Sequence, residues 1–204
     1  ARPFDGQPGS FIRTSGRRDF SLEPPEKTLL DLLAMAGSKT LAIGKINDLF
    51  TGRGVASRVK TANNDEVMQA VMDAVSNDND HALIFANCVD FDEKWGHRND
   101  EVSFASGLER FDQMLSELLP LLRKDDLLVI TADHGCDPTI KSSTDHSREY
   151  VPLLVYGRAI RTGVDLGTRE TFADLGATLT DWLGVTAPGS GSTFCNLIVP
   201  GRNR

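Results

Sequence analysis

Short apolar segments of strand type alternate along this chain with amphipathic helical segments, and this alternation restricts the fold more than any other feature. Strands are expected within residues 40–44, 82–86, 127–131 and 151–156, and helices within 26–36, 64–75, 103–123 and 171–183. The segment 127–131 is apolar without alternation, which suits a strand covered on both faces. This order predicts an α/β fold, a three-layer sandwich around a mainly parallel sheet.

Local signals set the expected ends of the helices. Gly37 follows the first helix and Gly184 follows the last, and glycine is the usual residue just beyond a helix C-terminus. Pro120 lies inside the segment 103–123 and is expected to end that helix early, because proline lacks the N–H that a helix interior needs.

Charge and composition exclude several kinds of partner. The formal net charge of -7 argues against a nucleic-acid surface, because phosphate backbones are held mainly by clustered Lys and Arg. No run approaches the roughly 20 apolar residues of a membrane helix. The three cysteines, Cys88, Cys136 and Cys195, are widely spaced, which predicts reduced thiols and a cytoplasmic protein. Any phosphate bound here must be met by a few placed cations or by metal ions.

Three of the four histidines lie in short polar motifs at the ends of the expected strands. Asp92 and His97 follow the second strand, Asp133 and His134 follow the third, and His146 precedes the fourth. Ligands of an open parallel sheet gather beyond the carboxyl ends of its strands. Carboxylate and imidazole together suit Mn²⁺, Zn²⁺ or Fe²⁺, and two such ions can clamp a phosphoryl group. The pattern therefore predicts a two-metal phosphoryl-transfer site.

Each motif also has a simpler interpretation. Asp92 with His97 alone would more often belong to a solvated loop, and Asp133-His134-Gly135 could form a turn after a buried strand. The fourth histidine, His81, precedes a strand in an Asn- and Asp-rich turn and is expected at the surface. The coincidence of all three motifs favours the metal site.

Several longer runs resemble the signatures of phosphopentomutases, which are members of the alkaline phosphatase superfamily. The runs are 1–4, 42–46, 89–92, 96–98, 131–138 and 144–152. The resemblance therefore spans nearly the whole chain. It implies an alkaline-phosphatase-like metal-binding core at 25–204, incomplete at its N-terminal side, and it implies that 1–24 are the end of an inserted cap domain and its linker.

The resemblance also implies an activity, in which phosphate moves between positions 1 and 5 of ribose or deoxyribose. The transfer runs through a phosphorylated Thr held on the metals and through a sugar bisphosphate, which acts as activator. Two Mn²⁺ ions are implied as cofactors. The implied ligands are Asp92, His97 and His146 for one ion, and Asp133 and His134 for the other.

Two basic residues are implied at the substrate by the same resemblance. Lys45, at the end of the first strand, would hold the substrate phosphate as a point charge, although a surface Lys is the simpler interpretation. Arg13 is a weaker candidate for contact with substrate or phosphate.

Two parts of the family's site have no counterpart in this sequence, namely a further Asp ligand and the phosphorylated Thr. Thr131, Thr139 and Thr144 fit strand-end or turn roles better. The expected partners are a small phosphorylated pentose and the missing N-terminal segment of the same enzyme, without which the sheet exposes edges. Two alternatives stay open: a non-catalytic metal-binding fragment, and a related metal-dependent phosphoglycerate mutase or phosphatase.

Overall fold

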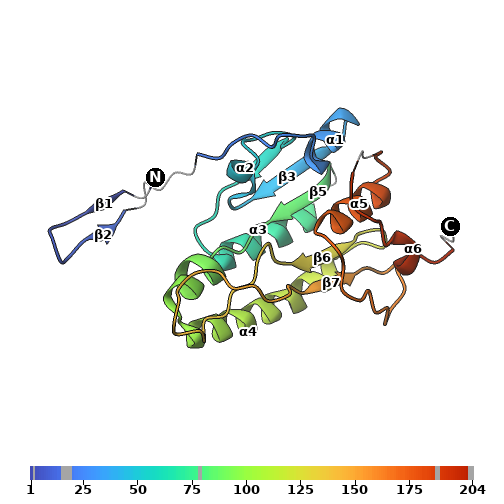
Figure 1. Ribbon diagram of the computed structural model, residues 1–204. Coiled ribbons are helices and arrows are strands. Elements are labelled where there is room, and N and C mark those ends of the chain that lie inside the picture. Colours follow the sequence, from blue (N-terminus) through green and yellow to red (C-terminus); the bar gives the residue numbers. More distant parts are fainter. Residues whose placement is uncertain (2, 15–19, 78–79, 187–188, 202–204) are drawn as a thin grey trace.

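The computed structural model describes residues 1, 3–14, 20–77, 80–186 and 189–201, and their arrangement is the predicted α/β fold (Figure 1). The strands are β1 Phe4–Asp5, β2 Ile12–Arg13, β3 Lys39–Ile43, β4 Ser57–Val59, β5 His81–Ala86, β6 Leu128–Thr131 and β7 Leu153–Tyr156. The α-helices are α1 Leu29–Met35, α2 Ile46–Leu49, α3 Asn64–Asn77, α4 Glu101–Leu118, α5 Ala173–Trp182 and α6 Cys195–Ile198. A π-helix, η1 Phe91–Trp95, and two 3₁₀ helices, η2 Gly96–Arg98 and η3 Leu119–Leu121, complete the set.

The predicted parallel sheet is confirmed, with β3 at its centre. The strand order is β4-β3-β5, and β3 runs parallel to both neighbours. In the described part of the chain, β6 and β7 form a separate antiparallel pair, and β1 and β2 form a hairpin. The four strands expected from the sequence are β3, β5, β6 and β7, so the pattern located the central strands and missed the short ones.

Strand β3 is buried on both faces, which explains its unbroken apolar sequence. Leu41 and Ile43 pack against α3 in one apolar cluster that includes Val67. Thr40 and Ala42 point to the opposite face, since side chains alternate along a strand, and both are also buried. Helix α1 contacts β3, and Figure 1 shows α1 and α3 on opposite sides of it.

A second apolar cluster joins α3 to α4 and to β6. It consists of Met68 and Met72 from α3 and Met114 and Leu118 from α4, and Leu128 at the start of β6 packs against it. Helix α3 therefore packs against both the parallel sheet and the start of β6.

The ends of α4 follow from its sequence. The Asp100 carboxylate accepts a hydrogen bond from the Ser103 amide at 3.0 Å, which caps the first turn. The helix ends at Leu118, and Pro120 lies in the 3₁₀ helix that follows, so the early end predicted from Pro120 is confirmed.

The N-terminal hairpin β1–β2 extends away from the rest of the molecule in Figure 1. The rings of Phe4 and Phe11 meet edge to face with centroids 4.9 Å apart. Arg13 belongs to β2, but its side chain lies outside the described part of the structure. Among the described helices, none is both long and apolar enough to cross a lipid bilayer.

Candidate metal centre

The π-helix η1 carries Asp92 and is fixed to α3 by a reciprocal pair of hydrogen bonds. The Asp90 amide donates to Asn64 Oδ1 and the Asn64 amide donates to Asp90 Oδ2, both at 3.0 Å. Both residues are buried, so these bonds are shielded from water. π-helices are rare and occur mostly at functional sites. The Asp90–Asn64 pair therefore fixes the position of Asp92 relative to the sheet.

Three imidazole nitrogens converge on one oxygen of Asp92. Asp92 Oδ1 lies 3.3 Å from His97 Nε2, 3.3 Å from His146 Nε2 and 3.9 Å from His134 Nε2. The donor atoms of Asp92, His97 and His146 all lie within 4.8 Å of one another. Asp92 Oδ1 is buried and has no hydrogen-bond partner among the described residues. A cation coordinated by these atoms would satisfy that oxygen.

Two of the rings are oriented by backbone carbonyls. His97 Nδ1 lies 2.7 Å from the Thr144 carbonyl oxygen, and His134 Nδ1 lies 3.0 Å from the Gly135 carbonyl oxygen. A carbonyl only accepts, so Nδ1 donates in both contacts and Nε2 is the nitrogen that each ring turns toward Asp92, as in histidines that bind metals. The His134 and His146 rings stack with centroids 3.8 Å apart.

Asp133 lies at the border of the cluster. Its Oδ1 is 3.8 Å from His134 Nε2, but its side chain is 89% exposed. The structure therefore brings together Asp92, His97, His134 and His146 and leaves Asp133 on the solvent side of His134.

An isolated antiparallel bridge between Gly135 and Ser147 holds the two histidine loops together. The Ser147 amide donates to the Gly135 carbonyl at 3.1 Å. A Cβ at position 135 would lie 2.9 Å from both the Ser147 carbonyl oxygen and the Glu149 amide nitrogen, which is too close. Glycine is therefore needed for the approach that stacks His134 on His146.

Lys45 lies at the same edge of the sheet. Its amide donates to Asn87 Oδ1 at 2.8 Å, which ties the ends of β3 and β5 together. Gly44 has φ +78°, and a Cβ there would lie 2.6 Å from Asn87 Oδ1. The Lys45 ammonium forms an ion pair with Glu93, the neighbour of Asp92 in η1. Sequence reasoning missed Asn87 and Glu93. Asn87 could have been found from its position directly after β5, and Glu93 from its position next to Asp92 in the sequence.

The three threonines near the cluster have local roles. The Thr139 hydroxyl donates to Asp137 Oδ1 at 2.7 Å, and the Thr131 hydroxyl donates to the Ala132 carbonyl at 3.5 Å. The backbone carbonyl of Thr144 accepts the hydrogen bond from His97 Nδ1. These contacts agree with the predicted strand-end and turn roles.

Two other side chains near strand ends are not predicted ligands. His81 is the first residue of β5 and is partly buried, with Nε2 2.6 Å from the Ser57 hydroxyl, so its side chain is less exposed than predicted.

Cys136 follows the Asp133-His134-Gly135 motif. Burial, with the negative charge of Asp92 adding to it, raises the pKa of the Cys136 thiol, which keeps this group protonated at neutral pH.

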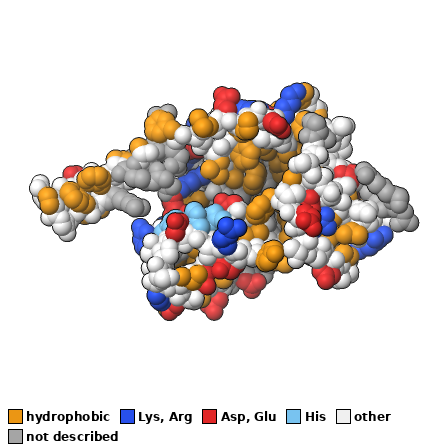
Figure 2. Space-filling model, in the orientation of Figure 1, with side chains coloured by type: hydrophobic (Ala, Val, Ile, Leu, Met, Phe, Trp, Pro, Cys, Tyr) orange, Lys and Arg blue, Asp and Glu red, His pale blue; other side chains and the backbone are white. Residues whose placement is uncertain are grey.

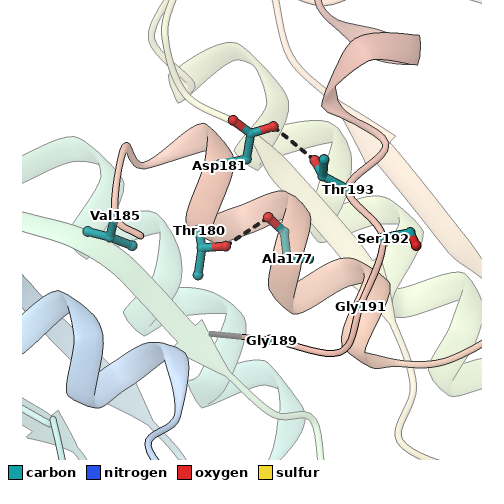
Figure 3. Close-up of a pocket in the computed structure, with 8 residues that line it drawn as sticks. All are labelled: Ala177, Thr180, Asp181, Val185, Gly189, Gly191, Ser192 and Thr193. Atoms are coloured by element: carbon teal, nitrogen blue, oxygen red, sulfur yellow. Dashed lines mark hydrogen bonds between the residues drawn. The ribbon is translucent and has the colours of Figure 1, made fainter. Parts of the chain in front are cut away.

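A separate hollow of about 450 Å³ lies beside α5 (Figure 3). Its lining residues are Ala177, Thr180, Asp181, Val185, Gly189, Gly191, Ser192 and Thr193. The Thr193 hydroxyl donates to the Asp181 carboxylate at 3.0 Å, and the Thr180 hydroxyl donates to the Ala177 carbonyl at 2.8 Å. These polar groups are satisfied within the chain, and none of the predicted site residues lines the hollow.

Comparison with known proteins assigns the family. A family described as the metalloenzyme superfamily matches residues 17–187. The chain belongs to this superfamily. Its curated relatives include the phosphopentomutase of Thermotoga petrophila, which is 52% identical over 198 residues, or 97% of this chain and 50% of the relative. The phosphopentomutase of Clostridium novyi is 49% identical over 199 residues, or 98% of this chain and 50% of the relative. The resemblance inferred from the motifs is confirmed, and the chain spans about half the length of the curated relatives it matches.

A solved structure supports the fold of this superfamily member. The crystal structure of phosphoglycerate mutase from Leishmania mexicana superposes with a TM-score of 0.65 at 19% identity. The match covers 83% of this chain and 38% of that one. At this identity the likeness bears on the fold alone, and it agrees with the predicted alkaline-phosphatase-like core.

Proposed function

We propose that this chain is the metal-binding half of a phosphopentomutase, an enzyme of nucleotide metabolism in the cytoplasm. It would interconvert ribose 1-phosphate and ribose 5-phosphate, or the deoxyribose counterparts. The observation that carries the proposal is the convergence of three Nε2 atoms on the buried, unsatisfied Oδ1 of Asp92. Sequence identity of 49–52% to phosphopentomutases, over nearly the whole of this chain, supports the choice of reaction.

Two Mn²⁺ ions are proposed as cofactors on the strength of the resemblance. Imidazole and carboxylate together suit divalent transition metals, which supports a metal of this class. Asp92, His97 and His146 would hold one ion, and Asp133 and His134 would contribute to the other. When bound, the ions would neutralise charge on the transferred phosphoryl group and orient its oxygens. His97 and His134 are oriented for this purpose, since the contact of each Nδ1 with a backbone carbonyl leaves Nε2 facing the cluster.

Lys45 is proposed to bind the substrate phosphate. Its ammonium forms an ion pair with Glu93, the neighbour of Asp92 in η1, which supports a role for this positive charge beside the proposed metal-binding side chains. Arg13 is proposed as a second cation on the strength of the resemblance alone. Residues 1–24 would then belong to a cap that excludes water from the transfer, and 25–204 would form the metal-binding core.

The nucleophilic Thr and one more Asp ligand are assigned to the other half of the enzyme. The hydroxyls of Thr131 and Thr139 are engaged in local hydrogen bonds, which supports this assignment. The proposed cycle stores the phosphoryl group on that Thr and passes through a sugar bisphosphate, so the transfer is divided into two easier steps.

Metal stoichiometry and substrate choice test the proposal together. The chain is loaded with Mn²⁺, alone and with the other half of an enzyme of this family, and assayed on ribose 5-phosphate and on 3-phosphoglycerate. Two ions and turnover of the pentose phosphate in the combined sample are expected. Binding of one ion without turnover in either sample would identify a non-catalytic fragment, and turnover of phosphoglycerate alone would identify the related mutase.

A further inference from the structure

Two of the proposed metal ligands come from separate segments of the chain. His97 lies in η2, and His146 lies in the connection between β6 and β7. Their ring centroids are 4.9 Å apart, and the Nε2 atom of each lies 3.3 Å from Asp92 Oδ1. Figure 2 shows histidine side chains gathered at one face of the molecule. Residues 137–146 of the connection belong to no helix or strand, so their position depends on contacts with other segments.

Asn99 joins the two segments through its side-chain amide. Its Nδ2 donates to the Ile140 carbonyl and to the Ser143 carbonyl, both at 3.0 Å. An Asn amide carries two N–H donors, so both of them are used on this connection. The next carbonyl along the chain, that of Thr144, accepts the hydrogen bond from His97 Nδ1 at 2.7 Å. In Figure 1 the connection passes the N-terminal end of α4, which begins two residues after Asn99.

The backbone of Asn99 is fixed on both sides. Asn99 ends η2 in the left-handed conformation, with φ +52° and ψ +36°. Its amide donates to the Gly96 carbonyl at 3.1 Å, and the Asp100 amide donates to the Trp95 carbonyl at 3.1 Å. The Asp100 side chain in turn caps the first turn of α4. The direction of the Asn99 side chain is therefore set by η2 and α4.

A role in the turn alone does not explain this residue. Glycine adopts the left-handed conformation more readily than asparagine, so the turn by itself favours glycine. Among the described residues, Thr51 is the other non-glycine residue with positive φ, at +53°. Its hydroxyl donates to the carbonyl of the adjacent Phe50, whereas the bonds of the Asn99 amide span 41 and 44 positions. What asparagine adds is the contact with the distant connection.

We propose that Asn99 is a positioning residue of the metal centre. Its amide holds the connection that carries His146 against η2, which carries His97, so that both Nε2 atoms face Asp92. Asn99 acts through the backbone of residues 140–144. The inference rests on the proposed function for the bound ion, whereas the contact of the amide with the connection is independent of it. Residues that orient metal ligands typically change metal affinity about 10- to 100-fold when they are replaced.

The variant Asn99→Gly tests the positioning role, because glycine keeps the left-handed turn and removes the amide. Mn²⁺ binding, measured by titration calorimetry, should weaken about tenfold or more. Co²⁺ bound in place of Mn²⁺ should show an altered visible absorption band, since the ligands around it are displaced. The matched control is Thr51→Gly, which makes the same kind of change at the other left-handed position.

The control should change Mn²⁺ affinity less than about twofold, since Thr51 makes only a local contact in the described structure. Circular dichroism should show both variants folded. Mn²⁺ affinity of Asn99→Gly within about twofold of the unmodified chain, or equal weakening in the two variants, would overturn the inference.

Hydrogen exchange in metal-free buffer separates this inference from the proposed function. The amides of Asp145, His146 and Ser147 donate hydrogen bonds in the unmodified chain. In Asn99→Gly, residue-level exchange of these amides should be about fivefold faster or more, because the connection is released. Unchanged exchange would overturn the inference whatever the metal result. If the unmodified chain bound no Mn²⁺, the proposed function would fail, and faster exchange in the variant would still establish that Asn99 holds the two segments together.

Discussion

Replacing His146 with alanine removes one of the three donors at the proposed first ion. Its Nε2 lies 3.3 Å from Asp92 Oδ1, and no other described side chain takes that position in the cluster. Loss of a residue that merely orients a ligand typically weakens metal binding about 10- to 100-fold. Loss of a ligand itself should therefore weaken Mn²⁺ binding by roughly 100-fold or more, or about 2.8 kcal/mol at 1.4 kcal/mol per tenfold.

Titration calorimetry with Mn²⁺ measures this effect directly. The control is His81→Ala, since the His81 ring contacts the Ser57 hydroxyl and lies outside the cluster. The control should bind Mn²⁺ as the unmodified chain does, and circular dichroism should show both variants folded. Mn²⁺ affinity of His146→Ala within threefold of the unmodified chain would refute the ligand assignment.

Three further predictions concern the supports of the site and the core. Gly135→Ala should weaken Mn²⁺ binding roughly tenfold or more, because the new Cβ displaces Ser147 and separates the histidine loops; unchanged calorimetric affinity would contradict this. The hydrogen bond from the Ser192 amide lowers the pKa of buried Asp174 below its ordinary value of 3.8. The ionised carboxylate therefore stabilises the folded chain above pH 3.8, and this stabilisation is lost as the pH falls through the lowered pKa. In urea titrations, Asp174→Asn should therefore lose less stability between about pH 5 and about pH 3 than the unmodified chain, and an equal loss would argue against the role. Partial burial raises the pKa of Cys88 to about 11, so iodoacetamide at neutral pH should label it far more slowly in the folded than in the unfolded chain, and equally rapid labelling of Cys88 in the folded chain would contradict the raised pKa.

The central strands and the place where the polar motifs gather were predictable because each depends on local sequence. An apolar run such as 128–131 has few alternatives to a covered strand, and polar residues directly after such a run fall at the ligand-binding edge. Pro120 likewise ended α4 by local chemistry.

The parts that sequence reasoning missed depend on contacts between distant segments. The π-helix η1 has no periodicity that distinguishes it from a loop, and its position is set by the Asn64–Asp90 pair across 26 positions. Strand β4 is short and mostly polar, so only its pairing with β3 makes it a strand. The exposure of Asp133 and the ion pair of Lys45 with Glu93 are set by the fold, and residue type alone does not indicate them.

Anomalous diffraction from crystals grown with Mn²⁺ tests the metal centre most directly. A peak at the manganese edge is expected at coordination distance from Asp92 Oδ1, His97 Nε2 and His146 Nε2, with a second peak beside His134 when the other half of the enzyme is present. Ordered side chains at these positions with no anomalous peak between them, or manganese bound only elsewhere on the chain, would contradict the account.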